Sequence, residues 1–230
     1  YYYKVDLPLR IHKEALESTQ YYKKLYGIGI PATLNIALPS VLISVLNAIL
    51  VSYSAIYVVV LGIYYKLQTF VFMPTNGIIQ GIRPLVGYNY GAKEYKRVNK
   101  IYKLTLSLSL IIMIAGTFLC FVFPKEIMGL FTTNEETLNA GIVALRIISI
   151  SFVFSSLSLT SGGVLEGLGM GIPSLIISLC RYVVIILPCA YILSSLLGPT
   201  GVWHAFWITE VFTAMVSLFI YKKKKKDLFD

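Results

Sequence analysis

Long stretches without any charged side chain are the feature of this 230-residue chain that most restricts its fold. Residues 25–65, 104–124 and 147–165 contain no Asp, Glu, Lys, Arg or His. A helix needs about 20 predominantly apolar residues to cross a bilayer, so each stretch is long enough for a membrane span. Only 13% of the residues are charged, whereas soluble domains carry about 25%. The chain is therefore predicted to be an all-α, polytopic membrane protein.

Turn residues and polar loops divide the chain into six predicted transmembrane helices. These cover about residues 27–51, 55–86, 101–123, 138–168, 173–197 and 202–221. Residues 27–221 are thus expected to form a six-helix transmembrane bundle. Residues 1–26 are expected to form a linker and an interfacial amphipathic helix, and residues 222–230 a basic cytoplasmic tail. A short helix is also expected in the loop near Met128 and Phe131.

The 20 Lys and Arg residues are concentrated in three places. Five precede the first predicted helix, five lie between residues 93 and 103, and five form residues 222–226. With six helices these clusters share one side of the membrane, and only Lys125 is basic among the loops of the other side. Basic residues accumulate on the cytoplasmic side, so both ends of this cell-membrane segment are predicted to be cytoplasmic. This placement explains the net charge of +9 without nucleic-acid binding.

Three motifs occur in one order along the chain. The first is MPTNG at residues 73–77, followed by GIRPLVGYNYGAK at residues 81–93. The second is GLGMGIPS at 167–174 with SLCR at 178–181, and the third is GVWHAF at 201–206 with Glu210. They resemble the eighth helix, the tenth-to-eleventh helix hairpin and the last helix of the multidrug and toxic compound extrusion (MATE) family. The resemblance covers nearly the whole chain.

The MATE resemblance implies a fold of two six-helix bundles, of which this chain would be the C-terminal lobe. It implies a secondary-active antiporter that exports drugs or other small amphipathic, often cationic compounds in exchange for protons or sodium, by rocking of two lobes. The implied partners are the N-terminal six-helix lobe and the lipid bilayer. Residue 1 is Tyr rather than Met, which favours a chain that is part of a longer protein.

The acidic residues of one MATE branch are missing at the matching positions. In the branch often described as sodium-coupled, the first and fourth helices of this half carry carboxylates. Here those stretches read NIALP at residues 35–39 and FSSL at residues 154–157. The resemblance therefore implies no identifiable site for the coupling ion in this half, and no cofactor.

Polar residues in the first two predicted spans are the candidate substrate-binding groups. Lys66, Gln68, Asn35 and Asn76 are expected to face the cleft, because prolines at positions 31, 39 and 74 favour bends there. A packing role remains open for each of them, since interhelical hydrogen bonds and ion pairs use the same residue types.

Arg181 and Glu210 are expected to form a structural ion pair. They lie at similar depth in the fifth and sixth predicted spans, which a four-residue turn joins, and a lone charge in hydrocarbon is costly. Glu166 and Arg83, near the cytoplasmic ends of their spans, are each expected to be solvated or structural. The direction of each side chain around its helix stays open.

Two sets of glycines are expected at close helix contacts: Gly163, Gly167 and Gly171, and Gly77 with Gly81. No nucleophile–base pair and no metal-ligand spacing is present, since the three cysteines and the two histidines stand alone in sequence. An enzyme is therefore not expected. Two alternatives remain: a lipid-linked oligosaccharide flippase of the same superfamily, for which Lys66 and Arg83 would be the basic residues, and a non-transporting membrane scaffold.

Overall fold

The computed structural model describes residues 19–229, and its regular elements are all helical. Six helical segments are long and apolar enough to cross a membrane, which confirms the predicted six spans. In chain order the elements are α2 (Thr19–Val51), α3 (Ala55–Gly91), α4 (Tyr95–Val122), α5 (Pro124–Gly129), α6 (Glu135–Gly167), α7 (Gly171–Leu179), η1 (Cys180–Val184), α8 (Ile186–Leu197) and α9 (Pro199–Phe229). The segments α7, η1 and α8 together make the fifth span.

Several helices are longer than the apolar pattern predicts. α3 continues to Gly91, α4 begins at Tyr95, and α9 includes the basic residues 222–226. Backbone hydrogen bonding continues through polar residues until a turn or a cap ends the helix. At the starts of α3 and α6, the side chains of Ser54 and Asn134 act as such caps by accepting a backbone hydrogen bond. The surface helix expected within residues 1–26 lies largely outside the described residues, and the chain belongs to α2 from Thr19 onward.

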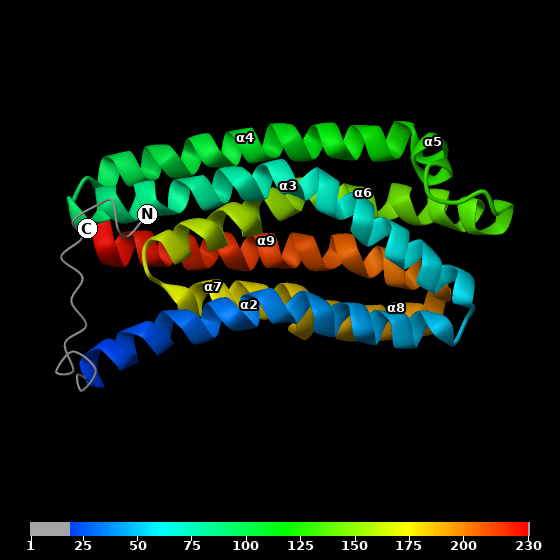
Figure 1. Cartoon of the computed structure of the whole chain (residues 1–230), viewed down its shortest axis with the longest axis horizontal. Helices are drawn as coiled ribbons and strands as arrows, with labels where there is room; N and C mark the ends of the chain where they lie inside the picture. The colour runs from blue at the N-terminus through cyan, green and yellow to red at the C-terminus, as the bar shows by residue number, and fades with distance from the viewer. Residues whose placement is uncertain (1–18, 230) are drawn as a thin grey trace, which may run out of the picture.

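α6 and α9 are the most buried spans and pack along each other (Figure 1). The buried face of α6 is rich in small hydroxyl residues, such as Ser151, Ser155 and Ser158. Small side chains let neighbouring helices approach closely. At the end that carries the α3–α4 turn, Tyr102 of α4 stacks on Tyr221 of α9 with ring centroids 3.9 Å apart. Together these contacts join α4, α6 and α9.

Close helix packing is confirmed for one of the two glycine sets. A Cβ at Gly163 would collide with Ile79 of α3, and one at Gly167 would lie 3.0 Å from the carbonyl oxygen of Arg83. A Cβ at Gly171 would lie 3.2 Å from Pro31 of α2. The same expectation is wrong for Gly77 and Gly81 within the described part of the chain, because a Cβ there would meet no atom within 4 Å.

Candidate functional site

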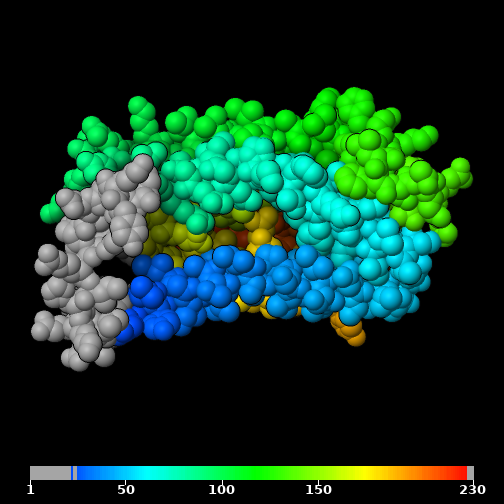
Figure 2. All heavy atoms as spheres, in the orientation of Figure 1, coloured from blue at the N-terminus to red at the C-terminus, as the bar shows by residue number. Residues whose placement is uncertain are grey.

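The bundle is hollowed on one side between α2 and α3. Two adjoining cavities of about 460 and 330 Å³ share the lining residues Asn76, Leu159, Arg181 and Tyr182. We call them together the α2–α3 cleft. Figure 2 shows this opening between the blue α2 and the cyan-to-teal α3, with later parts of the chain at its floor. A hollow of this size in the middle of a span can admit a small molecule.

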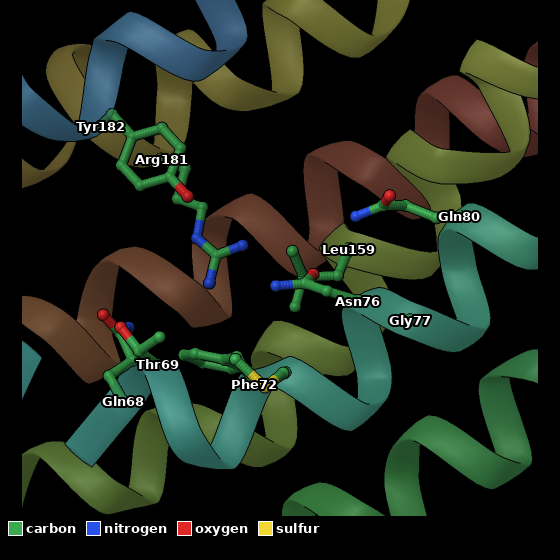
Figure 3. A pocket seen from close by; sticks show the side chains of 10 residues that line it. Gln68, Thr69, Phe72, Asn76, Gly77, Gln80, Leu159, Arg181 and Tyr182 are labelled. Carbon is green, nitrogen blue, oxygen red and sulfur yellow. The ribbon is translucent and has the colours of Figure 1, made fainter. Parts of the chain in front are cut away.

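One wall of the α2–α3 cleft is a polar stripe along α3. Gln68, Asn76 and Gln80 line it at helical spacing, on the same side as Phe72. None of these three amides forms a hydrogen bond with another described residue. Figure 3 shows them with Phe72 around the cavity. An amide can both donate and accept hydrogen bonds, so this wall offers both kinds of group to a molecule in the cleft.

Arg181 reaches the α2–α3 cleft from a local irregularity in the fifth span. It lies in η1, a π-helical turn with backbone bonding five residues apart, and such turns occur frequently at functional sites. The guanidinium extends across the cleft toward Phe72 of α3 (Figure 3). Its central carbon lies 5.9 Å from the Phe72 ring centroid and 5.4 Å from that of Tyr182. Both distances suit a cation–π contact.

Arg181 is also paired with Glu210 of α9, as the depth of the two residues predicts. Its Nε lies 2.6 Å from Oε1 of Glu210, and both side chains are less than 10% exposed. The other carboxylate oxygen accepts a hydrogen bond from Ser158 Oγ at 3.3 Å. Burying a charge is favourable only when it is paired and hydrogen-bonded. The contact joins the fifth span to the sixth, which follows it after Gly198.

A second charged cluster lies at another part of the α2–α3 cleft. Arg83 of α3 forms an ion pair with Glu166 of α6. Glu166 Oε1 also accepts hydrogen bonds from Asn35 Nδ2 at 2.9 Å and Ser174 Oγ at 2.8 Å. Sequence reasoning missed this cluster, because it treated Arg83 and Glu166 separately as groups near water. The only available signal was their similar distance from the same membrane face.

Three of the four candidate substrate-binding residues line the α2–α3 cleft. Gln68 and Asn76 are on its α3 wall, and Asn35 is on its α2 wall. Lys66 is exposed and lines neither of the two cavities that make up the α2–α3 cleft. Its assignment to a cleft therefore stays a prediction. Two further lining residues, Gln80 and Tyr182, were not singled out from the sequence as cleft residues.

The described residues contain no group of three or more His, Cys, Asp or Glu side chains that could hold a metal ion. Cys120, Cys180 and Cys189 are free thiols. The side chains that line the α2–α3 cleft can form hydrogen bonds, ion pairs and apolar contacts with a bound molecule. Such groups bind and orient a molecule.

Comparison with known proteins identifies the family. The MatE family model matches residues 31–192, which is more than half of the chain. This chain belongs to the MatE family. Its match begins at Pro31 in α2 and ends in α8, so it includes every helix that borders the α2–α3 cleft.

Curated relatives of this MatE chain are exporters. The multidrug export protein MepA of Staphylococcus haemolyticus is 27% identical over 208 residues, which cover 90% of this chain and 46% of the relative. The Staphylococcus aureus protein of the same name is 26% identical over 208 residues. The chain thus spans about half the length of the curated relatives it matches. These relatives are transporters, which agrees with the expectation of a non-enzymatic membrane protein.

Solved structures agree with the fold. An outward-facing multidrug resistance MATE family transporter of the MOP superfamily superimposes with a TM-score of 0.89 at 22% identity, covering 97% of this chain and 50% of that one. A MOP superfamily transporter from Pyrococcus furiosus gives a TM-score of 0.88 at 21% identity, covering 98% and 51%. The six-helix bundle described above is therefore a MATE-type fold unit, about half of each matched chain.

Proposed function

We propose that this MatE chain is the C-terminal lobe of a secondary-active exporter of small amphipathic compounds. The second lobe would be an N-terminal six-helix bundle, and transport would follow from rocking of the two lobes in the cell membrane. The observation that carries the proposal is the α2–α3 cleft, where unpaired amides, aromatic rings and Arg181 line a hollow about halfway along the spans. The export activity of the MepA relatives supports it.

We further propose that protons or sodium drive the export and that the driving ion binds outside this lobe. Glu166 lines the α2–α3 cleft and Glu210 lines a small cavity beside it, and each is already paired with an arginine. A carboxylate held by a guanidinium is a poor ligand for sodium, since the positive charge is already in place. The ends of this segment would be cytoplasmic, as the basic clusters indicate.

A lipid-linked oligosaccharide flippase is the second candidate. The structure places Arg83 and Arg181 at the same cavity, and a pyrophosphate is recognised well by arginine. Glu166 lines the same cavity and is bound to Arg83, so the cleft has less positive charge to offer a pyrophosphate than its two arginines suggest. The exporter therefore remains the function that the site supports best.

Transport by everted membrane vesicles tests the exporter. Vesicles from cells that express the native coding sequence should take up the amphipathic dye rhodamine B when a proton or sodium gradient is imposed. Substitution of Asn35 or Gln68, which line the α2–α3 cleft, by Ala should change the KM for rhodamine B while protein abundance stays near normal. Asn139→Ala is the matched control, since Asn139 is exposed on α6 and does not line the α2–α3 cleft. Dye uptake at the same rate with and without a proton or sodium gradient would contradict the proposal.

A further inference from the structure

The charges that border the α2–α3 cleft do not favour the binding of a cation that lacks an acidic group. Arg83, Arg181 and Glu166 line the cleft itself. Glu210 lines neither of the two cavities of the cleft but a smaller one of about 20 Å³ that Arg181 also borders, with room for about one water molecule. Within the described chain, the cleft therefore presents two guanidinium groups and one carboxylate, and that carboxylate is bound to Arg83.

Arg181 is accessible from the α2–α3 cleft although it is largely buried. Its side chain is only 8% exposed, yet it lines all three of these cavities. Among the described residues, Glu210 is its one ionic partner. A guanidinium has five N–H donors in a planar fork. A second acceptor approaching from the cleft would thus meet a positively charged, preorganised donor group.

Aromatic and amide side chains surround this guanidinium. Phe72 and Tyr182 lie within 6 Å of it, and Gln68 and Asn76 lie on the α3 wall of the same cavity. A planar apolar ring can pack against the aromatic side chains, while its anionic substituent reaches the guanidinium. The combination fits an amphipathic molecule with an aromatic body and a carboxylate, sulfonate or phosphate group.

Glu210 is the ionic partner of Arg181 when no such molecule is present. It holds Nε at 2.6 Å and keeps a second hydrogen bond from Ser158. An empty cleft therefore avoids an unpaired charge in the membrane, and Ser158 remains to stabilise Glu210 when Arg181 turns to a substrate. A substrate anion and Glu210 compete for the same guanidinium.

We propose that Arg181 is the anion-recognising group of the α2–α3 cleft, and that it selects amphipathic aromatic substrates carrying an acidic group, in competition with Glu210. This assignment rests on the exporter function proposed above and names the substrate class of the same cleft. It predicts that zwitterions or anions bind better than the corresponding esters, which lack the negative charge.

Rhodamine B and its ethyl ester are suitable probes, because they share one ring system and only rhodamine B has a free carboxylate. Binding is measured by fluorescence anisotropy with purified protein from the native coding sequence. The double variant R181M/E210L leaves no orphan charge, and it should bind rhodamine B about tenfold to a hundredfold more weakly, as expected for loss of a charged hydrogen bond. Its affinity for the ester should change less than about twofold, which is well under the loss expected for that bond.

Two further variants separate recognition from folding. Glu210→Gln removes the competitor and should tighten rhodamine B binding per folded molecule. Arg146→Met removes an arginine that is exposed on α6 and does not line the α2–α3 cleft. It should leave the affinities for rhodamine B and for its ester unchanged. The assignment would be overturned if the double variant lost the same factor of affinity for both dyes. It would also be overturned if the wild-type protein did not bind rhodamine B.

Vesicle uptake of the two dyes distinguishes this inference from the proposed function. If binding depends on Arg181 but neither dye is transported under any ion gradient, the exporter function fails and the anion site stands. If both dyes are transported and the double variant keeps the wild-type preference, the anion site fails and the exporter function stands.

Discussion

Arg83 and Glu166 form an ion pair that ties α3 to α6 beside the α2–α3 cleft. The same carboxylate accepts hydrogen bonds from Asn35 of α2 and Ser174 of α7. One side chain thus holds four helical segments together. Charge-assisted hydrogen bonds are stronger than neutral ones, so this cluster sets the spacing of α2 and α3 at that part of the bundle.

Glu166→Gln should lower the thermal stability of the protein in detergent. The change keeps the size of the side chain but removes the charge that three partners share. Because the Arg83 side chain is 43% exposed, we expect a loss of only about 1–2 kcal/mol. Unfolding can be followed through tryptophan fluorescence. Glu94→Gln is the control, since its pair with Arg97 is 3.8 Å long and exposed on both sides; equal shifts in the two variants would contradict the role given to Glu166.

The buried pair of Arg181 and Glu210 leads to a different expectation. Glu210→Gln leaves a buried arginine without its counter-charge, and breaking such a pair costs about 3–5 kcal/mol. Protein abundance in the membrane should therefore fall more in this single variant than in R181M/E210L, where both charges are absent. Quantitative immunoblotting of membrane fractions gives the comparison. A double variant less abundant than Glu210→Gln would show that the pair stabilises the bundle beyond charge balance.

Depth along a helix was predictable from the sequence, and rotation about its axis was not. The contact of Arg181 with Glu210 followed from equal depth in two spans joined by a short turn. Arg83 and Glu166 also share a depth, yet their pairing depends on which way α3 and α6 face. The two helices face each other at Gly163 and Gly167, where a Cβ would meet Ile79 and Arg83 of α3. A list of spans contains no such information.

The π-helical turn at η1 is a second feature that the sequence did not predict. The extra residue per turn changes the direction of Arg181 relative to a regular helix, and no proline or glycine lies within residues 180–184 to signal it. The number of spans, by contrast, followed from hydrophobic length together with the turn residues and polar loops between the apolar stretches. Gly77 and Gly81 failed as packing positions for a related reason: glycine permits close approach, but a neighbouring helix must be there to use it.

Labelling of introduced cysteines should test the topology. Figure 1 places the α3–α4 turn and the C-terminal end of α9 at one end of the bundle and α5 at the other. Lys96→Cys and Lys226→Cys, both at exposed residues, should react with an impermeant maleimide only from the cytoplasm. Thr133→Cys, exposed in the loop after α5, should react only from outside. Labelling of positions 96 and 133 from the same side would contradict the six-span arrangement.

Gly167→Ala should separate α3 from α6. The added methyl group would lie 3.0 Å from the carbonyl oxygen of Arg83 and 3.2 Å from its Cα, and a backbone cannot rotate away as a side chain can. Overpacking of this kind costs about 1–3 kcal/mol, so the melting temperature in detergent should fall. Gly77→Ala is the matched control, because its methyl group would meet no atom within 4 Å. Alanine is favoured over glycine inside a helix by about 0.5–1 kcal/mol, so this control should be neutral or slightly more stable. If Gly167→Ala is as stable as Gly77→Ala, the close approach of α3 and α6 does not limit stability, and the Arg83–Glu166 pair would have to hold the two helices without it.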